Sequence, residues 1–269
     1  MTDIANDQIS ALAASVAHLR KVADGLGPEQ LRAQAYPTEW SISDVLSHVG
    51  SGAETMQRRL DAFLAGEQPA DDFAQPIWDA WNAKSPEAKA ADALDVDRKF
   101  VDRLESLTDD EKARVDIVFG PMRLDLADFV GLRLNEHALH TWDIEVTLDP
   151  SATVPDYAVP EVVDKLESIA RFAGKTTGTE RDLHVQTSEP SRDFILSLGA
   201  DSVALTPRTA AHGRARARPR APRGGVDPSR VRPPGSGTHA GGTLGHRSVG
   251  AAAGLPRHLI PFLGAVAHR

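Results

Sequence analysis

Two segments of the chain place histidine and carboxylate side chains among apolar ones. The first, W-S-I-S-D-V-L-S-H, ends at His48, and the second, R-L-N-E-H-A-L-H-T-W-D, runs from Arg133 to Asp143. In the second segment Glu136 and His140 lie four residues apart, so on an α-helix their side chains point the same way, one turn apart. A nitrogen of His48 from a facing helix would complete a set of two histidines and one glutamate. Such a set suits a divalent metal with one coordination position left open.

The same spacing also fits a helix face that binds no metal. Residues at intervals of three and four form one polar stripe, which consists of Arg133, Glu136, His140 and Asp143. A solvated stripe of this kind gains about 0.2–0.5 kcal/mol from each ion pair. A lone histidine such as His48 can equally be a hydrogen-bonded residue of the core. His137 is turned by about 100° from Glu136 and is expected on the surface or in packing.

Four long segments with helical spacing of apolar residues must position these side chains. They cover residues 7–24, 41–64, 86–107 and 125–148. Ser41 and Asp44 suit a capping box at the start of the second segment, and Pro86 suits the first turn of the third. Four amphipathic helices joined by loops predict an antiparallel four-helix bundle. The connection through Phe73, Trp78 and Trp81 is predicted to be long and irregular, and residues 115–124 are predicted to form a short extended stretch with a turn.

After Pro155 the pattern changes. Residues 160–173 are predicted to form a helix that Gly174 ends, and three short segments of strand character follow it. These are residues 183–187, 194–198 and 202–206. A helix followed by closely spaced strands indicates the start of a small α+β domain, and a three-stranded meander needs more chain to complete its core.

The composition changes abruptly near His212. Residues 1–210 hold 37 acidic and 20 basic side chains, a net charge of −17, whereas residues 211–269 hold Asp227 as their one acid and ten arginines without lysine, a net charge of +9. The later segment has no apolar period and is rich in arginine, proline and glycine. Such a segment buries too little apolar surface to offset the conformational entropy of ordering.

Three explanations for this tail remain open. It could be a basic arm that binds nucleic acid phosphates, although it lacks lysine and interleaved aromatic residues. It could be a plain disordered tail. The composition favours a third explanation, a shift of reading frame near codon 212 in a GC-rich gene, because arginine, alanine, proline and glycine have GC-rich codons and lysine codons are AT-rich.

The whole-chain composition sets further bounds. The 269 residues suffice for one large or two smaller domains. The absence of cysteine excludes disulfides, zinc ribbons and a thiolate nucleophile from the protein itself, and it is compatible with a reducing cytoplasm. The N-terminus shows no signal-peptide pattern and no stretch reaches about 18 apolar residues, so we expect a cytoplasmic protein without a membrane span. The net charge of −8 argues against nucleic acid as the main partner.

The residues W-S-I-S-D-V-L-S-H (40–48) and R-L-N-E-H-A-L-H-T-W-D-I (133–144) resemble a known family. This is the mycothiol-dependent maleylpyruvate isomerase group of the wider DinB-like metal-binding bundles. The resemblance covers roughly residues 5–206, and it implies a mainly α fold. A DinB-like antiparallel four-helix bundle would be followed by a small α+β domain similar to sterol-carrier folds, here truncated and extended by a disordered tail. The implied boundaries are residues 5–150, 155–206 and 207–269.

The resemblance also implies a site. Its metal ligands fall on His48, Glu136 and His140, with Zn²⁺ or another divalent metal bound and mycothiol as thiol cosubstrate. Asp143 could orient the imidazole of His140, and Arg133 could pair with Glu136 or Asp143 or bind a substrate carboxylate. The family's isomerase also uses an essential arginine from its C-terminal domain, in a part that would lie beyond residue 206 of this chain, where the basic tail begins.

The sequence therefore predicts a divalent-metal-binding protein, a mycothiol-dependent isomerase or thiol transferase that acts on an electrophilic small molecule. The alternative is a non-catalytic bundle that binds a metal or ligand and has lost activity with its altered C-terminus. A third class is a structural bundle with a solvated polar stripe.

Overall fold

The computed structural model describes most of the chain up to residue 208. The described residues are 2–70, 72–120, 122–176, 178 and 180–208. The predictions for the basic tail, residues 211–269, and for a reading-frame shift near codon 212 lie outside these residues, as does most of the predicted segment 207–269.

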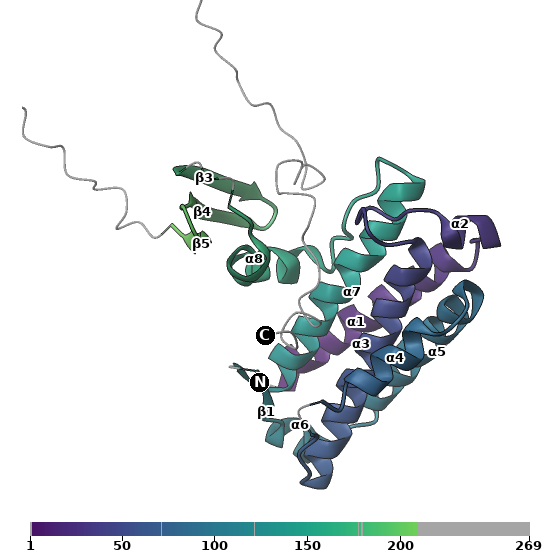
Figure 1. Ribbon diagram of the computed structural model, residues 1–269. Coiled ribbons are helices and arrows are strands. Elements are labelled where there is room, and N and C mark those ends of the chain that lie inside the picture. Colours follow the sequence, from purple (N-terminus) through teal and green to yellow (C-terminus); the bar gives the residue numbers. More distant parts are fainter. Residues whose placement is uncertain (1, 71, 121, 177, 179, 209–269) are drawn as a thin grey trace, which may run out of the picture.

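Four long helices form the bundle that the sequence predicts (Figure 1). They are α1 (Thr2–Ala23), α3 (Ile42–Ala65), α5 (Pro86–Glu105) and α7 (Leu126–Leu148). α1 packs against α7 and α5, and α3 packs against α5 and α7. The predicted fold class, a mainly helical bundle followed by a small α+β unit, is confirmed.

The start and the end of α3 follow from local chemistry. The Ser41 hydroxyl accepts a hydrogen bond from the Asp44 backbone N–H at 3.2 Å, and the Asp44 carboxylate accepts one from the Ser41 N–H at 3.0 Å. This is the predicted capping box, and it satisfies two backbone donors that the helix leaves free. Gly66 ends the helix with a φ of 75°, a conformation that glycine adopts without strain.

The connections contain more regular structure than the sequence predicts. Three short helices lie in them: α2 (Pro28–Arg32), α4 (Gln75–Asn82) and α6 (Asp109–Arg114). A two-stranded antiparallel hairpin, β1 (Ile117–Phe119) and β2 (Met122–Leu124), occupies the predicted extended stretch.

The prediction of an irregular connection through Phe73, Trp78 and Trp81 is wrong, because α4 forms there. Ile77 and Trp81, four residues apart, bury one face of this helix. The Trp81 ring fills the space beside Gly50 of α3, where a Cβ would lie 2.3 Å from the ring.

A polar layer divides the core of the bundle. On one side lies an apolar cluster that includes Leu12, Val16, Phe100 and Phe129. On the other side lies a second cluster that includes Leu19, Val49, Leu94 and Ile144. Between them every long helix contributes buried polar groups, among which are Ser15, Ser51, Asp97 and Glu136.

In the described part of the chain, the C-terminal unit consists of one helix and one small sheet. Helix α8 (Val159–Ala173) is followed by the antiparallel strands β3 (Arg181–Ser188), β4 (Ser191–Leu198) and β5 (Val203–Pro207), in the order β3-β4-β5. α8 packs against β5 on one side and against α7 on the other (Figure 1). The division into domains at residues 150–155 stays a prediction.

The contact between α8 and the bundle is apolar at its centre and polar at its edge. Ala158 and Val162 pack against Leu134 and Ala138 of α7.

Among the helices of the described residues, none combines the length and apolar character that crossing a bilayer requires.

Candidate metal centre

The structure brings together the three residues that the sequence singles out. His48 comes from α3, and Glu136 and His140 lie one turn apart on α7. One ligand atom from each residue can be chosen so that all three lie within 4.8 Å of one another. Nε2 of His48 and Nε2 of His140 each lie 3.6 Å from Oε2 of Glu136.

These separations suit a metal better than a direct hydrogen bond. Hydrogen bonds between nitrogen and oxygen have lengths of about 2.7–3.2 Å, so 3.6 Å is too long. With zinc–ligand bonds of about 2.0–2.2 Å and tetrahedral angles, two ligand atoms lie about 3.4 Å apart. The 3.6 Å spacing around Glu136 is therefore close to that of atoms that share one ion.

Glu136 Oε2 supplies a second indication. This oxygen is buried and has no hydrogen-bond partner among the described residues. The whole residue is 7% exposed. Burying a carboxylate oxygen without a partner costs free energy. A cation bound between the two imidazoles would supply the missing partner.

The ionisation of the site is set by its own members. Burial would raise the pKa of the Glu136 carboxyl, but His140 and His48 outweigh burial and hold that pKa well below its usual range. Burial and the neighbouring His140 lower the pKa of His48. Burial also opposes the charged form of His140, yet Asp143 and Glu136 raise the pKa of His140 to about 9. The metal-free site thus holds a carboxylate anion beside one protonated imidazole at neutral pH.

Asp143 lies where it can orient His140. Its Oδ2 is 2.9 Å from Nδ1 of His140. Once His140 is neutral, donation of its Nδ1–H to this carboxylate leaves the lone pair of Nε2 facing Glu136. Carboxylates in this position fix the tautomer and orientation of metal-binding histidines.

The polar stripe on α7 is not solvated, so the surface-stripe alternative is wrong. Its four members are at most 8% exposed, namely Arg133, Glu136, His140 and Asp143. Arg133 pairs with neither Glu136 nor Asp143. It bonds instead to Asp97 of α5, at 2.5 Å between Nη2 and Oδ1. His137, at 0% exposure, lies 3.2 Å from the other carboxylate oxygen of Asp97.

Sequence analysis missed Asp97. It lies on α5 between the buried Leu94 and Val101, three and four residues away, so it shares their face of the helix. This spacing from two apolar residues is the feature of the sequence that indicates a buried position for Asp97. Two other aspartates nearby, Asp92 and Asp95, are half-exposed and make the segment resemble a solvated helix.

One aromatic ring forms a wall of the centre. The ring centroid of Trp40 lies 5.2 Å from that of His48 and 6.0 Å from that of His140. The loop that carries Trp40 is hydrogen-bonded to α7, because the Tyr36 backbone N–H donates to the carbonyl of Asp143 at 3.3 Å. The indole therefore shields the two imidazoles on one side.

Comparisons with known proteins agree with this fold. Residues 12–145 match the family model described as the mycothiol maleylpyruvate isomerase N-terminal domain. A crystal structure of the mycothiol-dependent maleylpyruvate isomerase is similar to this fold, with a TM-score of 0.51, 11% sequence identity and coverage of 62% of this chain and 70% of that one. A histidine-to-alanine mutant of that enzyme gives a TM-score of 0.50 at 10% identity, with the same two coverages. No curated protein matches the sequence at a significant level. Through residues 12–145 this chain therefore belongs to the family of mycothiol maleylpyruvate isomerase N-terminal domains.

Proposed function

We propose that His48, Glu136 and His140 bind one divalent metal ion, with zinc as the expected metal. The observation that carries this proposal is the buried Glu136 Oε2, which has no hydrogen-bond partner among the described residues and lies 3.6 Å from two imidazole nitrogens. Two histidines and one glutamate form a donor set typical of zinc sites that keep a position open for a ligand.

The chemistry of such a centre fits a thiol-dependent enzyme. A bound zinc-like ion acts as a Lewis acid and lowers the pKa of a water or thiol bound to it. The residues of this chain would hold the ion, and Asp143 would keep the Nδ1 proton of His140 directed away from it. Trp40 would exclude water from one side.

The chain has no cysteine, so a nucleophilic sulfur must come from outside. We propose mycothiol as that thiol and an unsaturated electrophile as the substrate, with the cytoplasm as the compartment. Sulfur would add to one carbon of the double bond, and rotation about the resulting single bond followed by loss of the same thiolate would give the isomer. Retention of the carbon–sulfur bond with protonation of the adjacent carbon would give net thiol transfer.

A second candidate is a binding protein that holds a metal or thiol ligand without turnover. The sequence supports this candidate, because the part of the chain that would complete the C-terminal domain is the segment rich in arginine, proline and glycine. By the family resemblance, that part of the domain would carry an arginine essential to the isomerase.

Metal content tests the centre itself. Purified protein should contain about one zinc per chain, and Glu136→Gln or His140→Ala should lose it while keeping the helical circular dichroism signal. Glu145→Gln is the matched control, because Glu145 also lies on α7 beside a histidine, 2.8 Å from His18. Full zinc content in the Glu136 variant would refute the assignment.

Activity then separates the two candidates. The protein is incubated with mycothiol and maleylpyruvate, or with another conjugated electrophile, before and after chelation of the metal. An enzyme should show turnover that disappears on chelation and returns with zinc. Binding of metal and thiol without turnover would favour the binding protein.

A further inference from the structure

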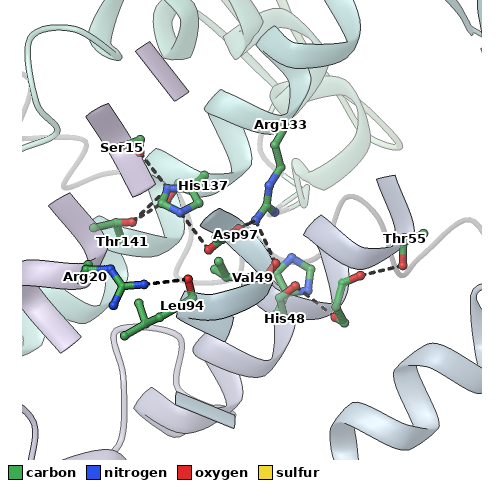
Figure 2. A network of polar contacts seen from close by, with 11 residues as sticks. Ser15, Arg20, His48, Val49, Thr55, Leu94, Asp97, Arg133, His137 and Thr141 are labelled. Atoms are coloured by element: carbon green, nitrogen blue, oxygen red, sulfur yellow. Dashed lines mark hydrogen bonds and ion pairs between the residues drawn. The ribbon is translucent and has the colours of Figure 1, made fainter. Parts of the chain in front are cut away.

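A second group of charged side chains lies in the same polar layer as the metal centre (Figure 2). Asp97 of α5 is at its middle: Oδ1 accepts a hydrogen bond from Nη2 of Arg133 at 2.5 Å, and Oδ2 lies 3.2 Å from Nε2 of His137. Arg133, Asp97 and His137 are each at most 1% exposed. None of them supplies an atom to the proposed metal centre, so their burial needs another explanation.

Arg133 also reaches the helix that carries His48. Its Nη2 donates to the backbone carbonyl of Val49 at 2.9 Å, and Val49 follows His48 directly in α3 (Figure 2). Gly52 leaves room for the guanidinium, because a Cβ there would lie 2.9 Å from Nη1. One side chain of α7 thus fixes both α5 and α3 at the level of the proposed ligands.

Stability alone explains these charges poorly. A buried ion pair loses the hydration of both charges, and its replacement by apolar side chains of similar volume is often neutral or stabilising. The planar guanidinium, however, donates in fixed directions and so imposes a geometry on its acceptors. Here the acceptors belong to α5 and to the turn of α3 that presents His48.

We propose that Arg133, anchored by Asp97, is a positioning residue that sets the spacing between α3 and α7 at which His48 meets Glu136 and His140. This inference rests on the proposed metal centre. Arg133 precedes Glu136 by three residues on α7, so a shift of its guanidinium acts close to the ligands. The Arg133 guanidinium contacts the backbone of α3 and not the ligand atoms themselves.

The other side of the network offers an internal control. Nδ1 of His137 lies 2.7 Å from the Ser15 hydroxyl, which belongs to α1. The Thr141 hydroxyl donates to the backbone carbonyl of His137 at 2.8 Å. α1 carries no proposed ligand, so this side ties α1 to α7 without affecting the approach of α3.

Two variants test the positioning role. The double variant Arg133→Met with Asp97→Asn removes both charges together and leaves neither unpaired. Gly52→Ala keeps every side chain of the network and places a methyl group against the guanidinium. In each, the zinc Kd is measured by competition titration, and Co²⁺ is substituted so that its visible absorption bands report the ligand geometry.

We expect the zinc Kd to rise about 10- to 100-fold in both variants, as for other residues that orient metal ligands, and the Co²⁺ bands to shift. Ser15→Ala should lower the melting temperature while its zinc affinity and Co²⁺ bands stay as in the wild type. Unchanged affinity and bands in the two folded variants would overturn the inference. An equal loss of zinc affinity in Ser15→Ala would also overturn the inference, because the effect would then come from a general loss of packing in the bundle. A wild-type protein that binds no zinc would instead overturn the proposed function.

Discussion

At the scale of single residues, Glu136 distinguishes a metal centre from ordinary core packing. A core histidine finds a hydrogen-bond partner, as His137 does with Asp97 and Ser15. Glu136 Oε2 lies between two imidazoles and bonds to neither. In one layer, therefore, the His137 imidazole has hydrogen-bond partners whereas the anionic oxygen Oε2 of Glu136 has none among the described residues, and a cation fits beside that oxygen.

Asp143 should contribute to metal affinity without touching the metal. Asp143→Asn keeps the shape of the side chain but removes the charge that supports His140 through the 2.9 Å contact. We expect the zinc Kd to rise about 10- to 100-fold, as measured by competition titration. Asp128→Asn, on the exposed part of the same helix, should leave the zinc Kd unchanged. Equal affinities for Asp143→Asn and the wild type would show that His140 needs no such support.

The metal-free protein should lose stability as the pH rises. Burial opposes protonation of His140, but Asp143 and Glu136 raise its pKa from 6.5 to about 9. The folded state therefore binds this proton more tightly than the unfolded state. The resulting stabilisation, at most about 3 kcal/mol, is complete below pH 6.5 and is lost as the pH rises through about 9. Urea unfolding of the metal-free protein across this range measures it.

His140→Gln is the control for that titration, and it should flatten the pH dependence in this window. A free energy of unfolding that rises from pH 6.5 to 9 in the metal-free wild type would contradict the prediction.

The sequence could predict the proposed ligands but not their surroundings. His48, Glu136 and His140 stand out because their residue types and the four-residue spacing of Glu136 and His140 suit a metal, and the family resemblance groups them. Asp97 does not stand out, because α5 carries charges on several sides and the sequence does not show which side faces inward. Its burial depends on Arg133, a residue of another helix 36 positions away.

At the scale of elements, helix length decided what could be predicted. The four long helices have enough turns to show an apolar period, and their predicted ends lie within two residues of the observed ones, except that α1 begins at Thr2 instead of residue 7. Helices α2, α4 and α6 have five to eight residues, about two turns or fewer, and show no such period. α2 and α4 bury apolar side chains against the bundle, Leu31 in α2 and Ile77 and Trp81 in α4. α6 buries no side chain and begins instead with a capping box formed by Thr108 and Glu111.

The contact between α3 and α4 should tolerate no added methyl group. Alanine favours a helix by about 1 kcal/mol over glycine, yet a Cβ at Gly50 would lie 2.3 Å from the Trp81 ring and 2.9 Å from the Ala93 Cα. We expect Gly50→Ala to lower the free energy of unfolding by about 1–3 kcal/mol. Gly25→Ala, where nothing lies within 4 Å, should change it little. Chemical denaturation compares the two, and an equally stable Gly50→Ala would show that Trp81 can move.

At the scale of the whole molecule, the bundle and the C-terminal unit meet along α7, the helix that carries two of the three proposed ligands. One side of α7 holds Glu136 and His140, and another packs Leu134 and Ala138 against α8. The sequence predicted both units but not this contact, because an apolar residue on α7 does not reveal whether it faces the bundle or α8. Changes at the C-terminal unit can therefore reach the proposed metal centre through one helix.

Gly131 of α7 leaves room for the Glu161 carboxylate of α8. A Cβ there would lie 2.6 Å from Oε1 of Glu161, and Oε2 of the same carboxylate accepts a hydrogen bond from Gln8 of α1 at 2.8 Å. Gly131→Leu should therefore push α8 away. We expect amide hydrogen exchange in α8 to speed up by about tenfold while α3 and α5 keep their protection, because the four long helices do not depend on α8. Glu167→Gln, on the exposed side of α8, is the control and should exchange like the wild type. Slow exchange in α8 of Gly131→Leu would show that its position depends on the sheet instead of on α7.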